Sequence, residues 1–274
     1  MEATHFDFEL ITETFAHGAY QTQNFNRPEL RAPSVKGMIR WWHDALGFSE
    51  NDARSIFGSV GTINQASPVS IRVTPVAPPQ SAPCEFMPHK GHRGGSKSAI
   101  LPGSCYRLIL SPRRGGLAPE LERQLLLATK AWLLLGAIGQ RSNRAAGSIQ
   151  WSDCPPDLKT FEVEASKILD NANVRFAFLA TNLNGDSTLA RSISGDFLKE
   201  EAFPGTAPFG SARPRKPSPL KLKCVRFDNE LHLLAIWDRR EESTQNLQSG
   251  VSTLIDSGKE LGRLLEAALP RLTA

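Results

Sequence analysis

The chain has 274 residues, of which 40% are hydrophobic and 22% are charged. This composition is typical of a globular protein and excludes the disordered and fibrous classes, and the length suits two domains of ordinary size. No apolar run is long enough to cross a bilayer, so we expect no membrane span.

The N-terminal segment and the cysteines bear on the compartment. The segment MEATHFDFEL has acidic residues and no apolar signal core, so we expect no export. The cysteines, Cys84, Cys105, Cys154 and Cys224, are far apart and form no CxxC pair. The sequence therefore predicts free thiols in a reducing cytoplasm, with no zinc site and no other cofactor.

The positive charge is unevenly distributed. Residues 1–150 hold 16 Lys and Arg against 11 Asp and Glu, whereas residues 151–274 hold 16 against 17. Concentrated positive charge fits a polyanion partner, because each phosphate that it neutralises releases counterions. In the second half, no acidic residue interrupts Phe203–Phe227, and the basic residues of that range are Arg213, Arg215, Lys216, Lys221, Lys223 and Arg226.

Hydrophobic periodicity predicts a β-α-β-β-α-β order for the first half. This order is typical of a ferredoxin-like (RRM-like) domain, and a loop rich in Pro, Gly and basic residues over 77–103 separates the two middle strands. The predicted strands are 5–12, 67–76, 105–112 and 148–152, the predicted helices are 34–46 and 120–136, and a turn is expected at 55–61.

The second half predicts a degenerate domain of the same kind, so we divide the chain into 1–153 and 154–274. The fold class expected is α+β, with tandem ferredoxin-like domains. The predicted elements are a helix over 156–172, a strand over 174–182, a short helix near 192–201, a hairpin of 219–227 and 230–238 around Asp228 and Asn229, and an amphipathic helix over 251–269.

The segment RAPSVKGMIRWW opens the first predicted helix and carries a basic face. Ser34 is a good helix-capping residue, and Lys36, Arg40 and His43 follow at helical spacing, away from the apolar stripe that contains Trp42. The simpler interpretation is an ordinary amphipathic helix with a solvated face, including an Arg40–Asp44 pair.

Two loops are candidates for anion binding. The segment 91–98 resembles a phosphate-binding loop but has Ser96 where glycine is required, so we reject nucleotide hydrolysis. We expect a basic surface loop, and the alternatives are a loop that contacts RNA and an unstructured surface insertion. The segment 134–149 interleaves glycines with Arg141, Asn143 and Arg144, which are phosphate and ribose donors. The alternative for this second loop is a glycine-rich turn between a helix and a strand.

Catalytic chemistry has little support in the sequence. The histidines show no metal-ligand spacing, and no nucleophile constellation is present. His43 is the best candidate for a general base in RNA cleavage, although a lone histidine on a helix is more often structural.

Taken in order, RAPSVKGMIRWW, IFGS and LGAIGQRSNRAAGS resemble the RAMP superfamily of CRISPR-associated RNA-binding proteins, and most of all the family of the first subunit of type III-B (Cmr) effector complexes. The resemblance covers roughly 6–151, and it departs from the family at Ala145 and Ala146, where glycine is usual. The matching positions are Arg31, Pro33, Ser34, Lys36, Gly37, Arg40, Trp42, Phe57, Gly58, Ser59, Gly139, Arg141, Arg144, Gly147 and Ser148.

The resemblance implies a non-catalytic subunit that binds CRISPR guide RNA, and the target RNA paired with it, beside other RAMP subunits and near the 3′ end of the guide. The alternative is a metal-independent RAMP endoribonuclease that processes CRISPR transcripts. Trp41 is a candidate for stacking on a base. The expected RNA-binding residues are Arg31, Ser34, Lys36, Arg40, Trp41, His43, Arg141, Asn143, Arg144, Arg213, Arg215 and Lys216.

Overall fold

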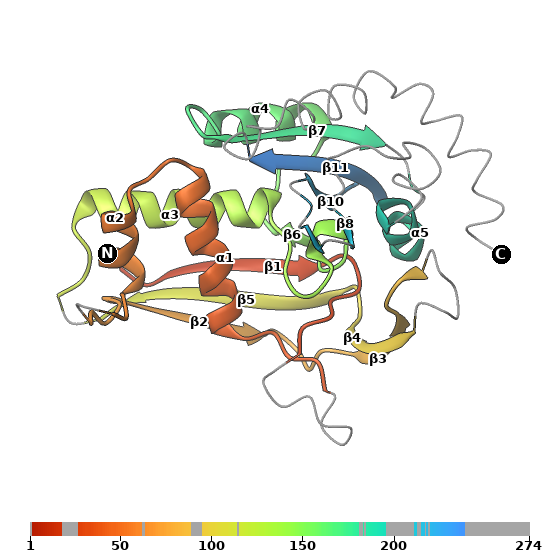
Figure 1. Cartoon of the computed structure of the whole chain (residues 1–274), viewed down its shortest axis with the longest axis horizontal. Coiled ribbons are helices and arrows are strands. Elements are labelled where there is room, and N and C mark those ends of the chain that lie inside the picture. The colour runs from red at the N-terminus through yellow and green to blue at the C-terminus, as the bar shows by residue number, and fades with distance from the viewer. Residues whose placement is uncertain are drawn as a thin grey trace.

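Helices and antiparallel strands alternate along the computed structural model (Figure 1), which confirms the α+β class. The described residues are 2–17, 27–61, 64–88, 95–113, 115–180, 183, 185–195, 211–212, 215–216, 218 and 220–238. The amphipathic helix predicted over 251–269 lies outside them.

A four-stranded antiparallel sheet forms the base of the molecule, in the order β2 (Val69–Pro75), β5 (Ser104–Pro112), β1 (Thr4–Leu10) and β6 (Ile149–Trp151). Alternation in β1 places Phe6, Phe8 and Leu10 in the core, as a half-buried strand requires. Phe8 lies opposite Tyr106 of β5, and the two rings stack with their centroids 5.8 Å apart.

The described part of this half has the α-helices α1 (Ala32–Ala45), α2 (Glu50–Phe57) and α3 (Pro119–Leu135). Figure 1 shows α1 crossing the sheet on the side where α3 runs. The sequence predicted only a turn where α2 ends. The hydroxyl of Ser49 caps α2 by accepting from the Asp52 amide at 3.1 Å, and Gly58 ends the helix at φ +79°.

The segment 77–103 is not a continuous loop, so that prediction is wrong. It contains the antiparallel pair β3 (Ser81–Glu85) and β4 (Ser96–Ile100). Ile100 also exchanges two backbone hydrogen bonds with Thr14, at 2.9 and 3.0 Å, so the hairpin is fastened to the segment that follows β1. Pro83 inside β3 and the glycines of the segment hid the strand pattern, because proline is confined to strand edges.

The second half contains α4 (Leu158–Ile168), α5 (Ser187–Ser192) and the sheet β10 (Leu220–Phe227), β11 (Glu230–Asp238), β7 (Val174–Ala180). The predicted hairpin is confirmed, with Asp228 and Asn229 in the left-handed region at φ +49° and +65°. Most of the short helix predicted near 192–201 lies outside the described residues, and α5 immediately precedes it. Short strands β8 (Ser211–Ala212) and β9 (Arg215–Lys216) pair with each other.

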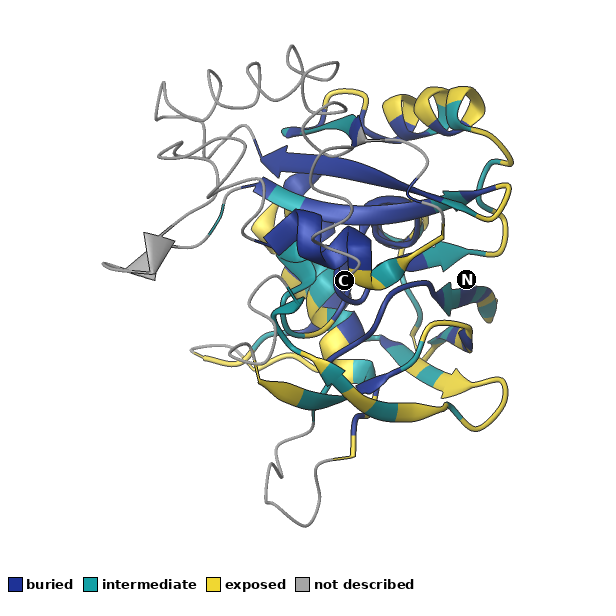
Figure 2. Ribbon diagram, turned by 90° about the vertical axis from the view of Figure 1, so that its right-hand side faces the viewer, coloured by how far each residue is buried: buried dark blue, intermediate teal, exposed yellow. Residues whose placement is uncertain are grey.

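One hydrophobic cluster joins the two halves. It includes Phe8, Trp42 and Trp132 from the first half and Phe161 and Phe227 from the second. Figure 1 shows α3 between the four-stranded sheet and the layer of α4 and β7, and Figure 2 shows the buried ribbons gathered in the middle of the molecule. The division at 153/154 stays a prediction, and the core crosses it.

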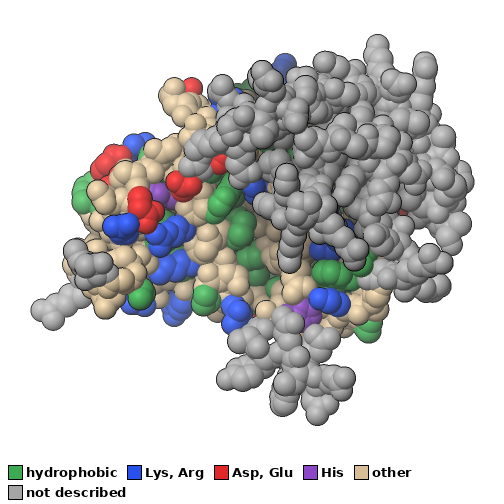
Figure 3. All heavy atoms as spheres, viewed as in Figure 1, with side chains coloured by type: hydrophobic (Ala, Val, Ile, Leu, Met, Phe, Trp, Pro, Cys, Tyr) green, Lys and Arg blue, Asp and Glu red, His purple; other side chains and the backbone are tan. Residues whose placement is uncertain are grey.

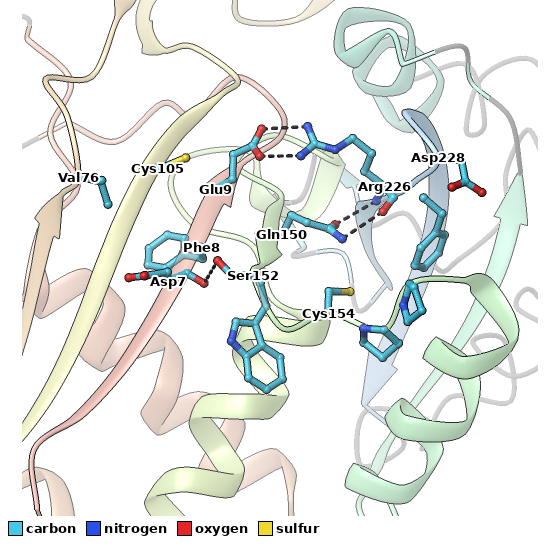
Figure 4. A pocket seen from close by; sticks show the side chains of 14 residues that line it. Asp7, Phe8, Glu9, Val76, Cys105, Gln150, Ser152, Cys154, Arg226 and Asp228 are labelled. Carbon is cyan, nitrogen blue, oxygen red and sulfur yellow. Dashed lines mark hydrogen bonds and ion pairs between the residues drawn. The ribbon is translucent and has the colours of Figure 1, made fainter.

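Polar contacts also join the halves, around the pocket drawn in Figure 4. The Arg226 guanidinium donates to both carboxylate oxygens of Glu9, at 2.9 and 2.6 Å. The Gln150 side-chain amide donates to the Arg226 carbonyl at 3.1 Å and accepts from the Arg226 amide at 3.0 Å. The side chain thus forms the same pair of hydrogen bonds with the Arg226 backbone that a residue of a neighbouring strand would form. Arg226 therefore belongs to a structural contact.

Candidate nucleic-acid interface

The start of α1 differs from the prediction. The helix begins at Ala32, with Arg31 as the capping residue and no side-chain hydrogen bond at the cap. Pro33 occupies the first turn, where its missing N–H costs nothing. Ser34 is therefore already inside the helix, and its amide donates to the Arg31 carbonyl at 3.0 Å. The predicted Ser34 cap is wrong, and Ser34 is instead an exposed residue of the first turn.

The exposed side of α1 carries Ser34, Lys36, Gly37, Arg40 and Trp41, which we call the α1 face. Figure 3 shows Lys and Arg side chains over α1 and α2, beside a column of apolar side chains. Arg40 Nη2 lies 2.8 Å from Glu50 Oε1, so its ion pair is with α2.

Lys36 lies among other cations. Partial burial lowers the pKa of Lys36, and the positive charges of Arg113 and Arg40 lower this pKa further. Arg113, which follows β5, was not expected at the site. Like charges near one another favour the binding of an anion, because an anion relieves their repulsion.

The adjacent tryptophans have different roles. Trp42 is 1% exposed and belongs to the core, whereas Trp41 is half-buried and meets Trp42 edge to face at 5.1 Å. Lys221 Nζ of β10 lies 4.3 Å from the Trp41 ring centroid. A cation thus already occupies one position over the ring of Trp41, and a base that stacks at that position must displace Lys221.

His43 does not lie on the basic face, so this part of the prediction is wrong. Its side chain is fully buried, between the rings of Phe48 and Phe57 at 4.9 and 5.7 Å. Burial lowers the pKa of His43. The buried side of α1 consists of Val35, Ile39, Trp42, His43 and Ala45. This side is wide enough to include a position assigned to the basic stripe.

The glycine-rich loop after α3 is packed against the protein's own backbone. At Gly147, φ is +64°, and a Cβ there would overlap the carbonyl oxygen of Ile138. Ala145 and Ala146 are buried, and the Thr12 hydroxyl donates to the Ala145 carbonyl at 2.6 Å. The glycine at 147 thus serves internal packing, and the surface of the loop is its outer turn.

That outer turn, residues 141–144, contains the 3-10 helix Ser142–Arg144. Its side chains are half-buried, and Arg141 begins it in the left-handed region at φ +59°. Arg144 Nη1 donates to the Asn143 carbonyl at 2.8 Å and to the Ser218 hydroxyl at 3.2 Å. The turn therefore presents two guanidinium groups and an amide from a firmly held loop.

The beginning of β10 lies between the α1 face and the 141–144 turn. Lys221 contacts Trp41, Ser218 contacts Arg144, and the Ala145 amide donates to the Leu222 carbonyl at 2.9 Å. Through the start of β10, the structure thus links Trp41 of the α1 face to the 141–144 turn. Lys221 was not among the expected RNA-binding residues, although its place in a basic run was a signal.

The basic run of the second half is only partly on the surface. Lys223 is 2% exposed and donates to the Leu134 carbonyl at 2.7 Å, so its assignment to a polyanion-binding cluster is wrong. Arg213 lies outside the described residues. The backbone of Arg215 and Lys216 forms β9.

Within the described ranges, no three His, Cys, Asp or Glu side chains are grouped so that they could hold a metal ion. In the same part of the chain, no helix is long and apolar enough to cross a membrane.

The fold and surface define an α+β protein with a cationic helix face beside a glycine-anchored, Arg-bearing turn. The model of the RAMP superfamily matches residues 7–150, and the chain belongs to this superfamily. It is 32% identical over 169 residues to the CRISPR system Cmr subunit Cmr1-1 of Pyrococcus furiosus. This match covers 53% of the chain and 46% of that subunit, so the chain matches about half the length of this relative.

Solved structures share the fold. The apo crystal structure of Cmr1 from P. furiosus matches with a TM-score of 0.54 at 21% identity, over 87% of this chain and 88% of that one. A chain in the cryo-EM structure of type III-B Cmr-beta with cognate target RNA, AMPPnP and ssDNA matches with a TM-score of 0.58 at 11% identity, over 94% and 100%.

Proposed function

We propose that the chain is a non-catalytic, RNA-binding subunit of a type III-B CRISPR effector complex. Membership of the RAMP superfamily and the similarity to a Cmr1 subunit support this assignment. The observation that carries it is the joining of the α1 face and the 141–144 turn at the start of β10.

Lys36, Arg40 and Arg144 are the residues that we expect to neutralise phosphates, and Asn143 and Ser34 offer hydrogen-bond donors to phosphate or ribose. Contacts of this kind position a strand without reading its sequence. The ion pair of Arg40 with Glu50 is exposed and therefore weak, so it does not prevent Arg40 from turning to a phosphate.

The partners follow from the resemblance. We propose that the chain binds CRISPR guide RNA together with the target RNA paired to it, meets other RAMP subunits, and caps the assembly near the 3′ end of the guide. The proposed setting is the cytoplasm. A similar solved chain comes from a Cmr-beta complex described as bound to cognate target RNA.

We also propose that the chain is built from tandem ferredoxin-like domains. In the first half, the strands of the sheet lie in the order β2-β5-β1-β6. If these four strands are numbered along the chain, the order across the sheet is 2-3-1-4, which supports this assignment. In the described part of the second half, the antiparallel sheet β10-β11-β7 and the helices α4 and α5 are compatible with a degenerate copy.

The rival function, RNA cleavage with His43 as general base, has less support. A general base must reach the proton that it removes, and His43 is buried with Nε2 bonded to Gln124.

Charge reversal tests the proposal. Lys36→Glu and Arg144→Glu are each expected to weaken binding of a labelled guide RNA at least tenfold, since each replaces an attraction to phosphate by a repulsion. Lys159→Glu, at an exposed position of α4, is the matched control and should bind as the wild type does. Unchanged binding by both test variants would refute the site.

A further inference from the structure

The ring of Phe86, just after β3, lies near two cationic side chains from segments that are far apart in the sequence. Lys97 Nζ of β4 lies 4.3 Å from the centroid of the Phe86 ring. The guanidinium carbon of Arg141 lies 5.7 Å from the same centroid. Both distances fall within the range of cation–π attraction. The β3–β4 hairpin and the 141–144 turn thus present two cations at one place.

The Phe86 ring is held by a buried cluster. It meets the fully buried Phe15 edge to face, with centroids 5.1 Å apart. The guanidinium of Arg191 lies 5.0 Å from the Phe15 centroid, pairs with Glu13 at 3.1 Å and donates to the Glu85 carbonyl. A rigid support of this kind lowers the entropy lost when a ligand binds.

The cations of this region differ in how their charge is balanced. Arg191 is buried and is balanced by Glu13. Lys97 Nζ donates to Gln140 Oε1 at 3.1 Å, a neutral acceptor, and within the described ranges no carboxylate pairs with it. An ammonium group has three donors, so Lys97 retains the capacity to bind an anion.

The charge of Lys97 also influences the nearby His17. Burial lowers the pKa of His17, and the charge of Lys97 lowers this pKa further. The charge of Lys97 therefore acts on His17 as well as on the Phe86 ring.

We propose that Lys97 and Arg141, positioned on the Phe86 ring, form a phosphate clamp that binds a phosphodiester of the RNA strand beside the 141–144 turn. The clamp rests on the RNA-binding function proposed above and extends it to the β3–β4 hairpin. The ring holds the flexible lysine stem in place, so less side-chain entropy is lost when the phosphate binds.

The test measures the affinity of the full chain for a labelled guide RNA at several salt concentrations between about 50 and 200 mM. Lys97→Met removes the charge and keeps the stem. We expect several-fold weaker binding and a salt slope of log affinity that is shallower by about 0.7, the value for one phosphate contact on a single strand. Lys97→Arg should retain the wild-type slope. The control Lys159→Met, on α4, should change neither quantity.

The outcomes separate the clamp from the wider proposal. If Lys97→Met lowers the melting temperature but keeps the wild-type affinity and slope, Lys97 only fastens the hairpin and the clamp is refuted. If Lys36→Glu weakens binding and Lys97→Met does not, the RNA-binding function stands without the clamp. If the wild-type chain binds no RNA, both proposals fail.

Discussion

His43 Nε2 lies 2.9 Å from Gln124 Oε1 in the buried contact between α1 and α3. The Gln124 amide nitrogen faces the carboxylates of Asp52 and Glu120, at 3.3 and 3.4 Å, so its oxygen accepts from His43. His43 therefore carries its proton on Nε2, and its buried Nδ1 has no hydrogen-bond partner in the described part of the structure. His43 therefore has a structural role in the packing of α1 against α3.

Burial of His43 in its neutral form makes stability depend on pH. Burial lowers the pKa of His43, although Gln124 and the negative charges of Asp52 and Asp44 act the other way. Below the unfolded pKa of about 6.5, the unfolded chain binds more protons at this residue than the folded chain does. The stability is thus complete above that pH and falls as the pH is lowered through it.

We expect His43→Leu to show a smaller loss of unfolding free energy between pH 7 and about 5 than the wild type shows. Chemical denaturation at the two pH values measures this loss. Val163→Leu, at an exposed position of α4, is the control and should keep the wild-type dependence. An equal loss in His43→Leu and the wild type would contradict the buried, neutral state of His43.

Lys223 is a second buried titratable group. Burial lowers the pKa of Lys223 to about 7, while the ordinary value is 10.5. Between pH 7 and 10.5, the unfolded chain holds a proton on Lys223 that the folded chain has largely lost. Lys223 therefore destabilises the fold at pH 7 and ceases to do so near pH 10. Lys223→Met, which loses the bond to the Leu134 carbonyl, should still be more stable than the wild type by about 2 kcal/mol at pH 7. This advantage should shrink toward pH 10, and a constant or reversed difference would contradict the account.

Gly147 tests the packing of the glycine-rich loop. Gly147→Ala adds a Cβ at positive φ that overlaps the Ile138 carbonyl, so we expect a loss of about 3 kcal/mol or more of unfolding free energy. Gly103 also has a positive φ but has no atom within 4 Å of an added Cβ. Gly103→Ala should therefore cost only about 1 kcal/mol. Equal costs at the two positions would show that the loop does not pack as described.

Gly37 is a helix residue with no internal need for glycine. An added Cβ would meet nothing within 4 Å, and φ is not positive. Alanine should stabilise α1 by about 0.5–1 kcal/mol, yet the residue lies in the middle of the α1 face. If RNA approaches the backbone there, Gly37→Ala should raise the melting temperature and weaken RNA binding at the same time.

The control for this prediction adds bulk to a different helix. Gly37→Leu should weaken RNA binding more than Gly37→Ala does, whereas Ser166→Leu, at an exposed position of α4, should not weaken it. Wild-type affinity in Gly37→Leu would mean that the strand does not come close to α1.

Much of the fold was predictable, because long periodic segments specify their own type. The strand β1 and the helix α3 are examples, and so is the hairpin whose turn is Asp228–Asn229. The strands β3 and β4 were missed because Pro83 and the glycines of the segment hide the strand pattern. The contact that fastens this hairpin, between Ile100 and Thr14, is tertiary and leaves no local pattern in the sequence.

The site was predictable in part. The sequence indicated the α1 face and the 141–144 turn, and the motifs that match the RAMP family contain both. Two errors have local causes: Pro33 moved the helix start ahead of Ser34, and the buried side of α1 is wide enough to include His43. Lys97 and Lys221 stood in basic stretches but were not among the expected RNA-binding residues, because periodicity does not show which ring a lysine contacts. Lys97 contacts Phe86 across the hairpin, and Lys221 contacts Trp41 of the other half.

The central claim is RNA binding without cleavage, and one measurement tests it directly. The purified chain is incubated with 5′-labelled CRISPR guide RNA and its precursor in the presence of EDTA, and the products are run on paired native and denaturing gels. We predict a shifted, uncut RNA, with the shift lost in Lys36→Glu and retained in Lys159→Glu. A discrete cleavage product, or no shift in the wild type, would contradict the account.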